Sequence, residues 1–343
     1  MLEKGKHAPP LDWPRHSGNL VLNTPWLSGN PAWGRHSASR EVQQEEVTLR
    51  CCQWKTSTCT SPEICMLLRL LTTCSRPWWT IRCISITRWI SIRDRVTWRR
   101  TLDVCDRQLR NCEAGLGSKF DGFPHSTGFD IVAASEVMTI MALAKDMEDL
   151  RERLGRIVVG YNRSGKPVFA RELNCIGSLC VILKDALKPN LVQTTEHTPV
   201  MIHCGPFGNI AHGCNSVRAT KMALKLAPYV VTEAGFAADL GAEKFIHIKC
   251  RQAGLNPNAA VLVATIRALK FHGGVEKENL GVENVEALRE GCQNLKTHAE
   301  NVRKYGLPVV VAINRFPTDT DEELETVRLF CESIGVDCEL SEV

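Results

Sequence analysis

The pattern of hydrophobic and polar positions is regular from Thr127 to the end of the chain. Apolar residues recur at helical spacing in long segments, and these segments alternate with short β-branched runs. That alternation is typical of parallel βαβ construction. A first helix is expected to begin at Ser135 and to end in the charged run at residues 152–156, and the most distinct later helices at 285–305 and 321–334. Strands are expected at residues 157–159, 200–203, 229–232, 260–265 and 307–313.

Two of these strands are almost continuously apolar, with the sequences Ala-Val-Leu-Val-Ala and Pro-Val-Val-Val-Ala. A strand without a polar side belongs to a sheet whose two faces are both covered. Residues 96–343 are therefore expected to form an α/β core, a doubly wound and mostly parallel sheet with helices on both faces.

Residues 1–95 follow neither the helical nor the strand period. All eight tryptophans lie between Trp13 and Trp98. Residues 1–95 hold 13 Lys or Arg against 7 Asp or Glu, a net charge of +6, so residues 96–343 carry −2 of the overall +4. The positive charge is therefore no argument for a nucleic-acid or membrane partner of the folded part. A basic, Trp-rich arm that binds nucleic acid is one hypothesis for residues 1–95, and a segment never selected for folding is the favoured one.

The sixteen cysteines include no Cys-x-x-Cys pair, and the chain does not begin with a charged segment followed by an apolar one. We therefore expect reduced, mostly buried thiols and a cytoplasmic protein. The most apolar runs, at residues 64–71 and 81–92, are short and interrupted by arginine, so no membrane span is expected.

Six sequence blocks resemble those of the formate–tetrahydrofolate ligase family. The two most specific are TEAGFAADLGAEKF at residues 232–245 and VATIRALKFHGG at residues 263–274. The others, in family order, are FDIVAASE at 129–136, LKDALKPNLVQT at 183–194, HCGPFGNIAHGCNS at 203–216 and NRFPTDT at 314–320. The resemblance covers about residue 97 to the last residue, and it implies a fold like that of P-loop NTPases.

The family's upstream blocks, a GEGKTTTT-type phosphate loop, REPSLGP, GAAGGGY and INLHFTGD, are absent as written. If permitted codons for this chain are read two nucleotides later, segments at residues 3–9, 31–47, 56–65 and 79–93 can give family-like sequences in family order. Residues 1–95 are therefore expected to be an aberrant frameshift product without a folded domain. Residues 96–343 are expected to be a truncated ligase core, because the family typically continues beyond Val343.

The resemblance implies an ATP-dependent ligase of one-carbon metabolism. In the family, ATP and Mg²⁺ convert formate to formyl phosphate, and tetrahydrofolate then takes the formyl group to give 10-formyltetrahydrofolate, ADP and phosphate. The intact family also implies a homo-oligomer. The chain has no Gly-x-x-x-x-Gly-Lys-Ser/Thr motif, so we expect it not to complete this reaction, and its catalytic residues are unknown. The alternative function is a non-catalytic protein that binds folate or a nucleotide.

The candidate ring-binding residues are Phe236 and Phe316, which match family aromatics that contact flat ligands. Each follows an expected strand, and doubly wound folds bind ligands at the carboxyl ends of strands. Core packing is the alternative for either ring. Asp239 is a candidate for orienting the folate or adenine ligand, with capping of the following helix as the alternative.

A second candidate region is a set of polar loop residues that could meet an anion or another ligand, namely His203, Asn209, His212, Lys270 and His272. The spacing of His203 and His212 with their neighbouring cysteines does not match zinc motifs, so no metal site is expected. For Lys270 and His272 the alternative is a solvated loop.

Three residues stand where the family usually has glycine, namely His197, Cys204 and Ala237. If the backbone at these positions is left-handed or approaches another segment closely, each substitution costs stability or alters the shape of the site.

Overall fold

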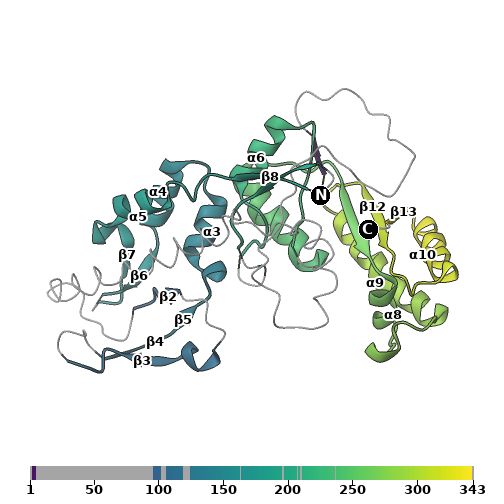
Figure 1. The fold of residues 1–343 in the computed structure, drawn as a ribbon, viewed down its shortest axis with the longest axis horizontal. Coiled ribbons are helices and arrows are strands. Elements are labelled where there is room, and N and C mark those ends of the chain that lie inside the picture. Colours follow the sequence, from purple (N-terminus) through teal and green to yellow (C-terminus); the bar gives the residue numbers. More distant parts are fainter. Residues whose placement is uncertain are drawn as a thin grey trace.

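The computed structural model describes residues 2–4, 96–101, 106–118, 124–162, 164–194, 197–206, 208, 211–235 and 237–341. The prediction for residues 1–95 therefore lies outside the described residues, except for β1 (Leu2–Lys4), which pairs antiparallel with β10 (Tyr229–Val231). Helices and strands alternate through the rest of the chain, and the α/β class is confirmed (Figure 1).

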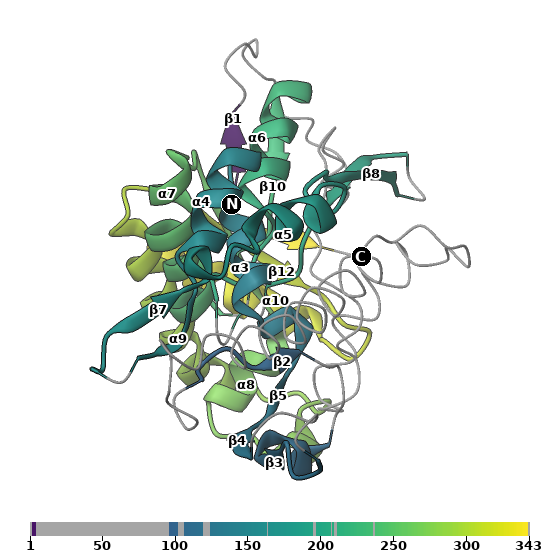
Figure 2. The same ribbon diagram turned by 90° about the vertical axis from the view of Figure 1, so that its left-hand side faces the viewer.

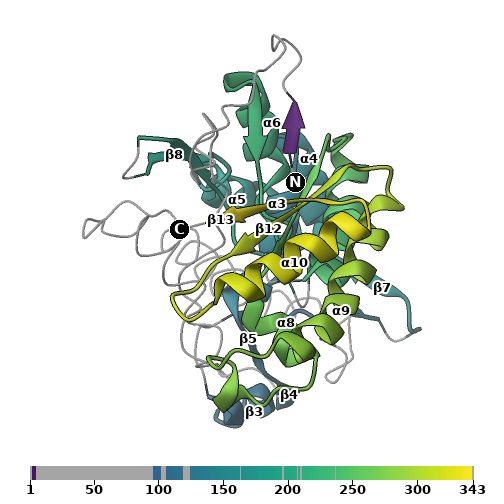
Figure 3. The same ribbon diagram turned by 90° about the vertical axis from the view of Figure 1, so that its right-hand side faces the viewer.

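The C-terminal part is built on three parallel strands in the order β11 (Ala260–Ala264), β12 (Val309–Asn314) and β13 (Asp337–Ser341). Three helices connect or flank these strands, namely α8 (Ile266–His272), α9 (Val285–Arg303) and α10 (Asp321–Ser333). All three helices share one buried apolar cluster with the strands, and Figure 3 shows them gathered on one side of the sheet. Alternate residues of β12 face this cluster, with Val309, Val311 and Ile313 buried.

The N-terminal described part holds a second apolar core, and Figure 2 turns the elements that form it toward the viewer. It joins α3 (Glu136–Leu143), α4 (Met147–Gly155) and α5 (Ile176–Leu183) to the hairpin of β6 (Val158–Tyr161) and β7 (Pro167–Phe169). The single helix expected from Ser135 to residue 156 is wrong. The Ser135 side chain caps α3 as expected, but Asp146 begins a new helix by accepting a hydrogen bond from the Asp149 amide.

The middle of the chain contains the hairpin of β8 (Asn190–Gln193) and β9 (Pro199–Ile202), followed by α6 (Val217–Leu226) and β10. A helical segment then runs from Ala238 to Ala253. It is wound as π-helix over η5 (Ala238–Ala242) and η6 (Phe245–Cys250) before α7 (Arg251–Ala253), and it ends at Gly254 with φ +66°. π-Helical turns are rare and often occur near functional sites.

The described strands form smaller sheets than the doubly wound pattern predicts. β11, β12 and β13 are parallel, as is the short pair β2 (Arg100–Thr101) and β5 (Phe129–Asp130). The hairpins β3 (Cys112–Ala114) with β4 (His125–Thr127), β6 with β7 and β8 with β9 are antiparallel. A short connection can join antiparallel strands but not parallel ones, so these hairpins follow from their short loops. None of the helices in the described part of the chain has the length and apolarity needed to cross a bilayer.

Candidate functional site

Phe316 lies at the carboxyl end of the parallel sheet, two residues beyond the end of β12. Its ring is half-buried, and the guanidinium carbon of Arg267 lies 5.0 Å from the ring centroid. Arg267 is in the first turn of α8, directly after the neighbouring strand β11, and its Nη2 donates to Thr318 Oγ1 at 3.2 Å. The two strand ends thus present an aromatic ring with a cation against it. Sequence reasoning missed Arg267, although it lies inside the VATIRALKFHGG block.

The loop that holds Phe316 is fixed by hydrogen bonds at both ends. The Phe316 amide donates to Asp319 Oδ2 at 2.8 Å, and the Arg315 amide donates to the Ser341 carbonyl at the end of β13. Arg315 also forms an ion pair with Asp321 at 3.1 Å. Asp319 is buried, and burial raises the pKa of its carboxyl group. The ring is therefore held in a defined position before any ligand arrives, which reduces the entropy lost on binding.

Lys270 is fully buried and lies neither in a solvated loop nor in a position to meet an anion from solvent. Its ammonium group donates to Glu323 Oε1 at 2.8 Å and to the Val282 carbonyl at 3.0 Å. Glu323 also accepts from the amides of Asn284 and Thr320. Burial alone raises the pKa of Glu323, but hydrogen bonds from Lys270, Asn284 and Thr320 outweigh it and hold the pKa below its usual value. This ion pair joins α8 to α10 beneath the Phe316 loop.

His272 is the last residue of α8 and is exposed, with its ring edge-on to that of Phe271. Asp239 is also exposed, in the first turn of η5, where a carboxylate suits the positive end of the helix dipole. Phe236 and Asn209, the other two candidates, lie outside the described residues.

His203 at the end of β9 is completely buried and has two partners within the protein. Its Nε2 lies 2.8 Å from the Ala186 carbonyl and must donate, while Nδ1 lies 2.7 Å from Ser216 Oγ and accepts. Burial lowers the pKa of His203 to about 4, so the ring is neutral at pH 7. Because both ring nitrogens are engaged, the geometry favours a structural role that ties β9 to the start of α6.

His212 is as buried as His203, but neither of its ring nitrogens has a hydrogen-bond partner among the described residues. Burial, together with the positive charges of Lys249 and Lys244, lowers its pKa to about 3. The backbone carbonyl of Cys214 lies near the ring and opposes this lowering of the pKa, although it does not reach full hydrogen-bond geometry. Within the described ranges, no group of three or more His, Cys, Asp or Glu side chains could hold a metal ion.

The loop that contains His203 and His212 touches the loop after β10 through glycine backbones. Gly213 has φ +64°, and a Cβ added there would lie 2.5 Å from the Gly208 Cα. A Cβ at Gly235, with φ +73°, would lie 2.3 Å from the Gly213 carbonyl oxygen. Only glycine permits both this conformation and these approaches. The two family-like blocks at residues 203–216 and 232–245 therefore form one structural region.

Two of the three unusual replacements of glycine fall at left-handed positions. His197 has φ +63° and Cys204 has φ +60°, whereas Ala237 is extended at φ −69°. A left-handed conformation costs a non-glycine residue roughly 1–2 kcal/mol. The expected conformational cost therefore applies to His197 and Cys204, and Ala237 carries no such strain.

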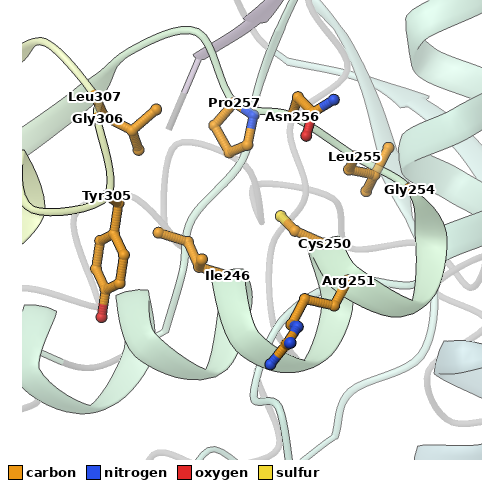
Figure 4. Close-up of a pocket in the computed structure, with 10 residues that line it drawn as sticks. All are labelled: Ile246, Cys250, Arg251, Gly254, Leu255, Asn256, Pro257, Tyr305, Gly306 and Leu307. Carbon is orange, nitrogen blue, oxygen red and sulfur yellow. The ribbon is translucent and has the colours of Figure 1, made fainter.

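A cavity of about 490 Å³ lies where the chain enters β11 and β12, whereas Phe316 follows the other end of β12. Figure 4 shows the residues that line it. It is bordered by η6, by the segment Gly254 to Pro257 that leads into β11 and by Gly306 and Leu307, which lead into β12. Its position at the amino ends of these strands separates it from the Phe316 region.

Comparison with known proteins gives one consistent family. Residues 85–343 match the family model for formate–tetrahydrofolate ligase. The chain is 61% identical over 243 residues to the formate–tetrahydrofolate ligase of Cereibacter sphaeroides (strain ATCC 17029) and 60% identical over the same length to that of Rhizobium rhizogenes (strain K84). Each alignment covers 71% of this chain and 44% of the relative, so the chain spans less than half the length of these relatives. The family match begins at residue 85, earlier than the residue 97 expected from the sequence blocks.

Proposed function

The chain belongs to the formate–tetrahydrofolate ligase family, and we propose that its described part is the half of such a ligase that receives the flat ring of folate or adenine. The observation that supports this most directly is the Phe316 ring, held at the carboxyl end of β12 with the Arg267 guanidinium 5.0 Å from its centroid. A planar ligand can stack on such a ring, and carboxyl ends of parallel strands are the usual ligand edge of α/β folds.

The proposed parent reaction joins formate to tetrahydrofolate at the expense of ATP, through formyl phosphate, and yields 10-formyltetrahydrofolate, ADP and phosphate. In it, Phe316 and Arg267 would orient the ring-bearing substrate, and Asp319 would hold the Phe316 backbone in place. Among the described residues, no group of three or more His, Cys, Asp or Glu side chains could hold a metal ion. No chemical step is therefore assigned to the metal.

We further propose that this chain binds its ligand without turning it over. Phosphoryl transfer depends mainly on groups placed in advance around the transferred phosphate. The 343-residue sequence contains no Gly-x-x-x-x-Gly-Lys-Ser/Thr loop to supply them. In this proposal, a frameshift over residues 1–95 accounts for the missing phosphate loop. The proposed protein is cytoplasmic and has no nucleic-acid partner.

Ligand binding to the purified chain tests the ring-binding half of this proposal. Tetrahydrofolate and ADP are titrated separately by calorimetry into the wild type, Phe316→Ala and the matched control Phe271→Ala, whose ring is 47% exposed on α8. Loss of stacking worth about 1 kcal/mol corresponds to a roughly fivefold weaker affinity for Phe316→Ala, with no change for Phe271→Ala. Equal affinities for the wild type and Phe316→Ala would contradict the proposed site.

Two further measurements test the inactive state and its origin. The purified chain, supplied with formate, ATP, Mg²⁺ and tetrahydrofolate, is expected to release no formate-dependent ADP, and steady release would show that it is a working ligase. The nucleotide sequence across the codons for Met1 to Trp98 tests the frameshift. Codons that cannot give the family segments when read two nucleotides later would exclude it.

A further inference from the structure

Two buried polar side chains lie in the region formed by the loops after β9 and β10, and neither makes a hydrogen bond within the described part of the chain. Lys249 on η6 is fully buried, and its Nζ makes no hydrogen bond there. His212 is 1% exposed, and the same holds for its Nδ1 and Nε2. Buried polar groups in folded proteins nearly always have partners, and a buried ammonium without one is especially unfavourable.

Packing and electrostatics both place the two side chains next to each other. Cys214, two residues after His212, shares a buried apolar cluster with Phe245 and Cys250, which lie on either side of Lys249 on η6. The Phe245 ring has Lys249 Nζ 5.0 Å from its centroid. The charge of Lys249 also lowers the pKa of His212 and acts on the thiol of Cys214. The ammonium group therefore lies against the Phe245 ring and close enough to His212 and Cys214 for its charge to act on both.

The backbone around this pair is fixed rather than loose. Lys244, one turn before Lys249, donates a hydrogen bond to the Gly208 carbonyl, so a second lysine ties η6 and its neighbours to the loop after β9. The close approaches of Gly213 to Gly208 and of Gly235 to Gly213 hold the two loops together. A site whose walls are held in this way can select a ligand by size as well as by charge.

From this arrangement we infer that Lys249 and His212 form a buried binding site for a small oxyanion. The ammonium supplies a positive charge and N–H donors, and the neutral imidazole can donate one further N–H through the appropriate tautomer. A phosphate or a small carboxylate such as formate offers the matching acceptors. Both side chains are almost completely shielded from solvent, so the ligand must be small. The site uses none of the side chains around Phe316, and for formate as its ligand it rests on the proposed function.

An internal partner for Lys249 is the competing explanation. Glu233 lies close enough for its carboxylate to raise the pKa of the Cys214 thiol, and it is exposed. A shift of its side chain onto Lys249 would neutralise the ammonium without any ligand. The two explanations differ in the effect of removing the lysine. An ammonium that lacks an internal partner destabilises the anion-free protein, whereas a paired one stabilises it.

The test uses the full chain in an anion-poor buffer, with inorganic phosphate and formate titrated separately by calorimetry at constant ionic strength. The variants are Lys249→Met and His212→Phe, which keep the side-chain bulk, and the control is Lys225→Met, at an exposed position on α6. We expect at least one of the two anions to bind the wild type and Lys225→Met equally, and to bind Lys249→Met and His212→Phe at least about tenfold more weakly. Whichever anion binds shows whether the site accepts a phosphate or a small carboxylate.

Thermal unfolding in the same anion-poor buffer supplies a second readout. Lys249→Met is expected to have a higher Tm than the wild type there and to lose the further rise in Tm that the bound anion gives the wild type. The site is excluded if neither anion binds the wild type, or if Lys249→Met binds it as tightly as the wild type. A lower Tm for Lys249→Met without anion would show an internal partner and would also overturn the inference.

Discussion

Replacement of Lys270 by methionine is expected to destabilise the C-terminal part strongly, because it leaves Glu323 as a buried charge. Both side chains are fully buried and lie 2.8 Å apart. Breaking a buried ion pair by removing one partner typically costs about 3–5 kcal/mol. Glu323 would keep its hydrogen bonds from the amides of Asn284 and Thr320. These compensate part of the lost charge interaction, so we expect the lower end of that range, about 3 kcal/mol.

The pairing is tested by a double-mutant cycle with Lys270→Met, Glu323→Gln and the double variant. Each single variant leaves one buried charge without its counter-charge, whereas the double variant leaves none and keeps a side-chain oxygen for the Asn284 amide. The double variant should therefore be more stable than either single variant. The free energy of unfolding is measured by urea denaturation, and the slope of the transition is compared among variants.

A surface ion pair provides the control for this cycle. Lys296 and Glu300 lie one turn apart on α9 with their charged atoms 4.0 Å apart and both side chains largely exposed. Lys296→Met is expected to change stability by no more than about 0.5 kcal/mol. If Lys270→Met costs as little as Lys296→Met, or if the effects of the two single variants simply add in the double variant, the ion pair does not hold α8 to α10.

Three other outcomes follow from the geometry. Burial lowers the pKa of His203 from about 6.5 to about 4. The unfolded chain therefore takes up a proton below pH 6.5 that the folded protein does not, and about 3 kcal/mol of stability is lost as the pH falls toward 4. In urea denaturation from pH 7.5 to 4, the free energy of unfolding should depend less on pH in His203→Gln than in the wild type, and as in the wild type in His272→Gln. Gly291→Ala should lower the Tm, because its Cβ would lie 1.8 Å from the Leu269 carbonyl oxygen, whereas Gly177→Ala, in a helix with open space, should raise stability by up to about 1 kcal/mol. Asp319→Ala should weaken tetrahydrofolate binding in calorimetry because the Phe316 amide loses its acceptor, and an affinity equal to that of the wild type would show that the loop does not depend on it.

The sequence by itself determined the features that depend on residues close together in the chain. Apolar spacing placed α9 and α10, and Ser135 marked the start of α3, because its side chain caps an amide only three residues away. Continuous apolar runs identified the strands that became β11 and β12. Six blocks in order were enough to identify the family, which the comparisons then confirmed over residues 85–343.

Only the tertiary structure decided how the polar side chains are used. Lys270 appeared to be a ligand candidate, but Glu323, 53 residues later, takes its ammonium group inside the core. Arg267 has no special pattern in the sequence, yet it lies against Phe316, 49 residues later. His203 and His212 are nine residues apart and equally buried, but only His203 has hydrogen-bond partners in the described part of the chain. Burial and pairing depend on which elements pack together, and neither residue type nor local spacing specifies those long-range contacts.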